Sequence, residues 1–113
     1  GIKSESQIKK ITKEIYEPVL GSSENYIRVN LGPFAFGAFF LRLFPDIAFE
    51  YFDKWIRRRD EWTRWNVLMT FSASRGKEYP DRARNYIEIV KDDRSLIVQR
   101  AIKSVSKKIG LKS

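Results

Sequence analysis

Two stretches of this chain resemble each other when the sequence is shifted by 34 residues, and this similarity restricts the fold more than any other feature. The shift aligns Ile56–Arg57 with Val90–Lys91, Val67–Leu68 with Ala101–Ile102, Phe71 with Val105, and Gly76 with Gly110. Each stretch has the pattern of two helices. A period in this range with two helices per unit is typical of an α-solenoid, in which each hairpin buries its apolar face against the next. We therefore predict an all-α fold, an αα-superhelix, with its clearest repeats at 46–76 and 80–110.

Among helical repeats, the HEAT-like class fits this pattern best. The tetratricopeptide pattern and the ankyrin T-P-L-H motif are both missing from the sequence. Two units alone are only marginally stable, so the residues before Pro45 are expected to supply a cap or a degenerate unit. A third copy is faintly indicated, because Phe34 falls on Leu68 at the same shift. The predicted architecture is one HEAT-like repeat domain over residues 1–113.

The expected helices have recognisable ends. Pro45–Asp46 and Pro80–Asp81 each place a proline and an acid at the start of a helix, where a missing N–H and a negative charge are tolerated. Asp60 is the expected N-cap of the next helix, and Gly110 occupies the C′ position after the last one. The helices predicted in this way cover roughly 5–17, 26–31, 34–44, 45 to the arginines at 57–59, 61–73, 80–90 and 94–109.

Apolar residues predict which helix faces are buried. The segment from Phe34 to Phe44 is apolar around nearly its whole circumference, so it is expected to lie between other helices. Gly37 and Ala38 permit a neighbouring helix to approach it closely. In the first helix, residues that recur every three or four positions form the predicted inner face: Ile8, Ile11, Ile15 and Val19.

The composition excludes several kinds of chemistry. The chain has 113 residues with no cysteine and no histidine, which excludes thiolate nucleophiles, imidazole bases, the usual zinc ligand sets and disulfides. We therefore expect no metal and no cofactor. No apolar run reaches the ~20 residues of a membrane span, and no signal peptide is visible. The missing cysteines fit an intracellular protein, and we expect a cytoplasmic location with no membrane partner.

The net charge of +8 favours an anionic partner. The segment from Lys54 to Trp65 carries five basic residues and all three tryptophans in twelve positions. A second basic stripe follows one side of the last helix. The residues predicted to bind nucleic acid are Lys54, Arg57, Arg58, Arg59, Arg64, Arg100, Lys103 and Lys107. The alternative explanation is that the arginines are merely solvated and that Trp62 and Trp65 belong to the core.

Several motifs of the chain occur in the same order in a known family. They are Phe40–Leu41–Arg42, Pro45–Asp46, Tyr51, Lys54–Trp55–Ile56, Trp62, Asp92–Asp93, Val98–Gln99–Arg100–Ala101–Ile102 and Gly110. Over roughly Phe34 to Gly110 the chain resembles the C-terminal part of the AlkD-type DNA alkylation-repair glycosylases, which are built from HEAT-like repeats. The resemblance implies a curved stack whose concave, basic surface holds duplex DNA. Members of that family are considerably longer, so it also implies a truncated member or a fragment.

The residues with which that family excises alkylated bases are not matched here. The resemblance implies an Asp, an Arg and tryptophans beside the lesion. Trp65 stands where the family has its arginine, with Arg64 one position away, and the tryptophan of the last helix falls near Ser104. No Asp occurs between Gly21 and Pro45, where the catalytic carboxylate lies. A glycosylase needs that carboxylate to stabilise positive charge on the sugar or to activate water, so we predict no family-type catalytic residues.

Three functions remain open from the sequence. The leading hypothesis is a module that binds the phosphate backbone of duplex DNA. The second is a protein-interaction scaffold, a role that helical repeats fill widely. The third is an active alkylpurine DNA glycosylase in which Arg64, Trp65 and Glu24 or Glu61 replace the missing residues. Basic residues gathered on one concave face favour the first, and basic residues scattered over several faces favour the second. The oligomeric state is left open.

Overall fold

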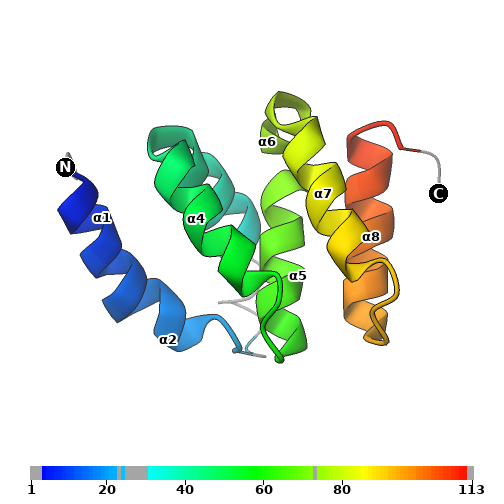
Figure 1. Ribbon diagram of the computed structural model, residues 1–113, viewed down its shortest axis with the longest axis horizontal. Coiled ribbons are helices and arrows are strands. Elements are labelled where there is room, and N and C mark those ends of the chain that lie inside the picture. The colour runs from blue at the N-terminus through cyan, green and yellow to red at the C-terminus, as the bar shows by residue number, and fades with distance from the viewer. Residues whose placement is uncertain (1–3, 23, 25–30, 73, 112–113) are drawn as a thin grey trace.

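A computed structural model describes residues 4–22, 24, 31–72 and 74–111, and every regular element in these ranges is helical. The elements, in chain order, are α1 (Glu5–Ile11), the π-helix η1 (Thr12–Tyr16), α2 (Glu17–Val19), the π-helix η2 (Leu31–Leu41), α4 (Pro45–Trp55), α5 (Glu61–Met69), the 3-10 helix η3 (Thr70–Ser72), α6 (Ser74–Glu78), α7 (Pro80–Val90) and α8 (Leu96–Lys108). The helices follow one another along the long axis of the molecule (Figure 1). The predicted all-α class is confirmed.

The predicted helix ends are largely correct. Pro45 and Pro80 are the first residues of α4 and α7. The side chain of Asp60 caps α5 by accepting a hydrogen bond from the backbone N–H of Thr63 at 2.8 Å. Gly110 follows the last helix with φ of +81°, in the left-handed region that favours glycine. These ends depend on contacts within one helical turn, which is why the local sequence predicts them.

The two helical hairpins α4–α5 and α7–α8 begin at positions that differ by 35 residues, not 34. The first helices start at residues 45 and 80, and the second helices start at residues 61 and 96. Buried positions fit either offset: at 35 residues Thr63 pairs with Val98 and Thr70 with Val105, and at 34 residues Val67 pairs with Ala101 and Phe71 with Val105. The helix starts therefore give an offset one residue longer than the hydrophobic pattern does.

The first helix buries a different face from the predicted one. Ile8 is buried as predicted, but its buried neighbours are Thr12, Tyr16 and Leu20, while Ile15 is 58% exposed. Ile11 and Val19 are half-buried. The reason is η1, whose wider turn places residues four apart on one side of the helix. The side-chain hydroxyl of Thr12 is satisfied by donating to the carbonyl of Ile8 at 2.8 Å.

The apolar segment is the π-helix η2, which lies between α4 and α5. A Cβ atom at Gly37 would lie 3.0 Å from the carbonyl oxygen of Thr70, so the predicted close approach at this glycine is confirmed. Ala38 is exposed and takes no part in it. The sequence left residues 32–33 between two predicted helices, at 26–31 and 34–44, but η2 begins at Leu31 and continues through both residues. The predicted helix at 26–31 lies outside the described residues except for Leu31.

The segment after α5 also differs from the prediction. Gly76 aligns with Gly110 in the sequence but, unlike Gly110, does not follow the end of a helix; it lies inside the short helix α6, buried against η3. A Cβ atom at this position would overlap the carbonyl oxygen of Phe71, so only glycine fits. Phe71 in turn packs against Phe52 of α4 and Tyr86 of α7, with ring centroids 6.5 and 5.7 Å apart. One aromatic core therefore joins the two hairpins.

Candidate nucleic-acid interface

The α4–α5 loop carries the three consecutive arginines, Arg57, Arg58 and Arg59, and all three are exposed. The backbone of this loop is ordered by hydrogen bonds. The N–H groups of Arg57 and Arg58 donate to the carbonyls of Lys54 and Trp55 at 3.2 and 3.1 Å, which continues the last turn of α4. We call residues 57–59 the arginine loop. Its side chains extend into solvent from a backbone that is held in place.

Arg64 of α5 donates hydrogen bonds to the backbone of this loop, and its environment differs from that of the other predicted basic residues. Its Nε and Nη2 atoms donate to the two carboxylate oxygens of Asp93 at 2.7 and 3.1 Å. Its Nη1 atom donates to the carbonyl oxygens of Arg58 and Arg59, both at 2.7 Å. The side chains of Arg64 and Asp93 are only 15% and 12% exposed. The guanidinium group is thus occupied within the protein, and we no longer count Arg64 among the phosphate-binding residues.

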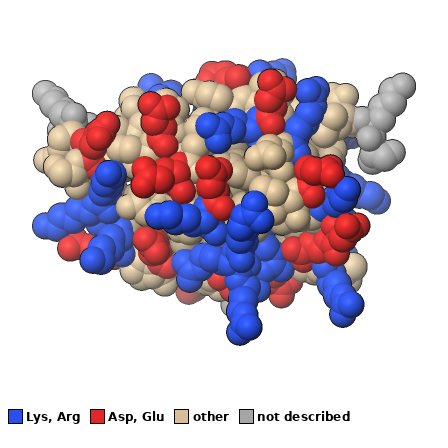
Figure 2. All heavy atoms as spheres, viewed as in Figure 1, with Lys and Arg blue, Asp and Glu red and all other residues tan. Residues whose placement is uncertain are grey.

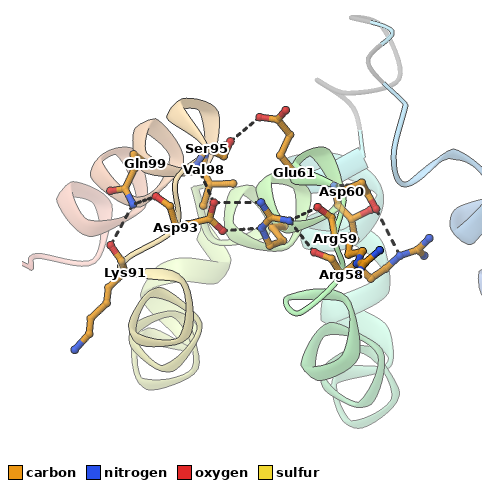
Figure 3. Close-up of polar contacts among 11 residues, drawn as sticks. Arg58, Arg59, Asp60, Glu61, Lys91, Asp93, Ser95, Val98 and Gln99 are labelled. Atoms are coloured by element: carbon orange, nitrogen blue, oxygen red, sulfur yellow. Dashed lines mark hydrogen bonds and ion pairs between the residues drawn. The ribbon is translucent and has the colours of Figure 1, made fainter.

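Asp93 lies in the α7–α8 loop, which is fixed by contacts of its own (Figure 3). Besides Arg64, its carboxylate accepts a hydrogen bond from the backbone N–H of Ser95 at 2.9 Å. The Ser95 hydroxyl contacts Glu61 Oε1 at 2.6 Å and caps α8 at the N–H of Val98. Gln99 donates to the carbonyl oxygens of Lys91 and Asp93. The α7–α8 loop is therefore joined to α5 by two polar bridges, Arg64–Asp93 and Glu61–Ser95.

An open pocket of about 440 Å³ lies between the two loops. Its apolar lining comes from Ile56, Ile89 and Val90. Its charged lining has both signs, from Arg57, Arg58, Arg64, Asp92 and Asp93. Arg58 also lies 3.6 Å from Asp60, in an ion pair whose side chains are 42% and 36% exposed. Such an exposed pair is weak and can be exchanged for a contact with another anion.

Lys and Arg side chains gather toward the lower edge of the face in Figure 2, where the two loops lie in Figure 1. Lys54 belongs to the last turn of α4 next to this edge, with its ammonium group 5.7 Å from the ring centre of Tyr51.

The basic stripe on α8 extends away from that edge. Arg100, Lys103 and Lys107 are exposed, opposite the buried residues Val98 and Ala101. Helix α8 begins at the lower edge and ends at the upper edge of the molecule (Figure 1), and Lys107 lies in its last turn. Lys107 is therefore at the far end of the helix from the arginine loop.

The three tryptophans have different environments. Trp55 is 2% exposed and packs against Phe36 with ring centroids 5.4 Å apart. Trp62 and Trp65 are half-buried and pack edge-to-face on one side of α5, with centroids 5.7 Å apart. The prediction that both belong to the core is confirmed only in part, for Trp65, which packs against the core cluster.

Two residues of this interface were missed by sequence reasoning, Asp93 and Ser95. Ser95 had a local signal, since a serine three residues before Val98 is a typical N-cap. Asp93 belongs to the Asp92–Asp93 motif, but no local pattern pairs it with Arg64, because the two residues are 29 positions apart in the chain. Of the residues considered as replacements in a glycosylase site, Arg64 and Glu61 are engaged in the two bridges, and Glu24 is exposed.

Within the described ranges, no group of three or more acidic side chains is arranged to hold a metal ion. None of the helices in that part of the chain is long and apolar enough to cross a membrane. Comparison of the chain with protein-family models, with curated proteins and with solved structures gave no match.

Proposed function

We propose that this protein is a HEAT-like repeat module that binds the phosphate backbone of duplex DNA. The arginine loop carries the proposal: three consecutive exposed arginine side chains on a backbone ordered by hydrogen bonds. Guanidinium groups match phosphate oxygens in charge and geometry, and most contacts of DNA-binding proteins are of this sequence-independent kind. The net charge of +8 adds long-range attraction to the same partner.

The repeat part of the proposal is supported by the common offset of the two hairpins. Both first helices are eleven residues long and begin with proline, and the preceding residues, Phe44 and Tyr79, have similar backbone angles, with φ of −136° and −128°. The second helices, α5 and α8, pack against each other. Units that stack in this way bury a continuous core, as helical repeats do. In this proposal α1 to η2 act as the N-terminal cap.

The proposed phosphate-binding residues are exposed members of the predicted set. They are Lys54, Arg57, Arg58, Arg59, Arg100, Lys103 and Lys107. A cytoplasmic location belongs to the same proposal. We do not extend it to base excision, because Arg64 and Glu61 are engaged with Asp93 and Ser95.

Duplex binding as a function of salt concentration tests this function. If five or six cations contact phosphates, the logarithm of the binding constant falls with the logarithm of salt concentration with a slope of about −5. Replacing the three loop arginines by alanine should reduce the steepness of that slope by about 2.7. The matched control replaces Lys9, Lys10 and Lys13, three charged residues exposed on the first helix.

The control removes the same total charge from a different surface. If the arginine loop is the contact, the control keeps the wild-type slope within about one unit. Equal losses in both variants would mean that net charge alone attracts the DNA. No binding of the wild type to duplex at about 50 mM salt would refute the proposed function.

A protein-interaction scaffold is the second candidate, favoured by the spread of basic residues to two edges of the molecule. Lys107 lies in the last turn of α8 at the upper edge of the molecule, and the arginine loop lies at the lower edge (Figure 1), so these residues do not form a single basic patch. Helical repeats bind partners through extended surfaces of this kind. A wild-type protein that leaves duplex DNA unbound but captures a defined protein partner at moderate salt would support the scaffold.

A further inference from the structure

We infer that the Arg64–Asp93 pair positions the arginine loop for phosphate binding, an inference that rests on the function proposed above. Neither residue contacts the partner in this scheme. Arg64 acts through the backbone carbonyls of the loop, and Asp93 acts through Arg64. Both are therefore positioning residues.

The hydrogen bonds of Arg64 connect two loops that are far apart in the sequence. The Nη1 atom donates hydrogen bonds to the carbonyl oxygens of Arg58 and Arg59 at 2.7 Å each, so that two successive peptide groups of the arginine loop share one donor. The other side of the guanidinium group forms a bidentate pair with Asp93. A planar fork of this kind fixes direction as well as distance.

Asp93 is itself held against rotation. Its Oδ1 atom accepts hydrogen bonds from Arg64 Nη2 and from the backbone N–H of Ser95. Its backbone carbonyl accepts a hydrogen bond from Gln99 at 2.8 Å, and Gln99 extends from α8. The position of the arginine loop is therefore fixed by contacts with the second hairpin as well as by α4 and α5.

Ordering a loop only when the partner binds reduces affinity, because the loss of conformational entropy then opposes binding. In this protein the backbone of residues 57–59 is ordered beforehand, while the arginine side chains stay exposed. If the Arg64–Asp93 pair is lost, the guanidinium group that donates to the loop carbonyls is no longer held in direction, and the loop arginines sample more arrangements. Affinity for phosphates should fall although no phosphate-binding residue has changed.

The variant Asp93→Asn gives a test in which electrostatics and positioning predict opposite changes in the affinity for duplex DNA. The variant gains one unit of positive charge, so charge alone would tighten binding to duplex DNA. Loss of the bidentate pair should instead weaken binding by roughly tenfold, within the range of coupling seen in hydrogen-bond networks. The matched control is Asp92→Asn, an exposed neighbour with the same charge change, which takes no part in the pair. It should bind as tightly as the wild type or more tightly.

Limited digestion with trypsin measures how readily the backbone of the arginine loop opens, in the absence of DNA. Trypsin cleaves after arginine, and cleavage requires local opening of the backbone. Cleavage after residues 57–59, identified by mass spectrometry, should be roughly tenfold faster in Asp93→Asn than in Asp92→Asn. Circular dichroism must show that each variant is folded. If Asp93→Asn does not fold, Arg64→Lys replaces it: lysine keeps the charge but cannot bridge the carboxylate and both carbonyls.

The outcomes separate this inference from the proposed function. Weaker duplex binding together with faster loop cleavage supports it. Binding as tight as in Asp92→Asn overturns it, whether the loop is cleaved faster or not. If the wild type does not bind duplex DNA, the proposed function fails and the phosphate part of the inference fails with it. The cleavage rates then still decide whether the pair fixes the loop.

Discussion

Tyr86 of α7 is fully buried, and its hydroxyl group donates a hydrogen bond to Asp53 Oδ1 of α4 at 2.7 Å. Burial, followed by the hydrogen bond and the negative charge of Asp53, raises the pKa of Tyr86 far above its usual value of 10.0. The nearby Arg82 acts in the opposite direction. Its guanidinium group lies 3.8 Å from Asp53 and stacks 4.2 Å from the ring centre of Phe49. A single tyrosine thus couples α4 and α7, the first helices of the two hairpins.

This coupling predicts how stability depends on pH. In the unfolded chain Tyr86 loses its proton near pH 10, whereas in the folded protein it keeps it. The contribution of Tyr86 is therefore complete below pH 10 and falls above it. Between about pH 10 and 11, the free energy of unfolding of the wild type should fall by about 1 kcal/mol more than that of Tyr86→Phe.

Urea denaturation at several pH values checks this prediction. Tyr16 and Tyr51, whose pKa values are also raised by burial, are present in both proteins, so their effects cancel in the comparison. Below pH 9 the phenylalanine variant should be less stable by about 1 kcal/mol, the usual contribution of one hydrogen bond. Parallel stability curves for the two proteins up to pH 11 would contradict the raised pKa.

At the scale of elements, the π-helix η1 decides which side of the first helix is buried. Hydrophobic periodicity predicts that Ile8 and Ile15 share one face, but Ile8 is fully buried and Ile15 is 58% exposed. The same residue type on the same helix therefore has two environments. Ile8→Ala should lower the free energy of unfolding by about 2–5 kcal/mol, because it leaves a cavity.

Ile15→Ala is the matched comparison and should change the free energy of unfolding by less than about 0.5 kcal/mol. Chemical denaturation followed by circular dichroism measures both. Similar losses in the two variants would mean that the helix turns at the usual 3.6 residues and that both isoleucines face the core.

At the scale of the whole molecule, the core is continuous from the first helix to the last. The radius of gyration of the molecule is 13.1 Å, which is close to the ~13 Å expected for a globular domain of this length. Phe71 is fully buried at the centre, between Phe52 and Tyr86. Removing it should affect both hairpins together.

Two spectroscopic signals can test this continuity. All three tryptophans lie in α4 and α5, so their fluorescence reports on the first hairpin, whereas far-ultraviolet circular dichroism reports on all helices. The two denaturation curves should coincide in the wild type. They should also coincide in Phe71→Ala, shifted by about 3–5 kcal/mol of lost stability. Curves that separate would show that the hairpins unfold independently, as weakly coupled repeat units do.

The local sequence was sufficient for helical class and most helix ends. Pro45, Asp60, Pro80 and Gly110 act within one turn of the helices they begin or end, and such short-range preferences do not depend on the rest of the fold. The exposure of the arginine loop also followed from sequence, because consecutive arginines are rarely buried.

Tertiary packing determined the features that short-range sequence preferences do not predict. The register of the first helix depends on the wider turn at Thr12–Tyr16, and the helix starts are 35 residues apart where the hydrophobic pattern gives 34. Arg64 reads as a surface cation in the sequence, yet it is paired because the fold brings Asp93 to it across 29 residues. A charged side chain can serve solvent, a partner or the protein itself, and only its three-dimensional neighbours determine which of these applies.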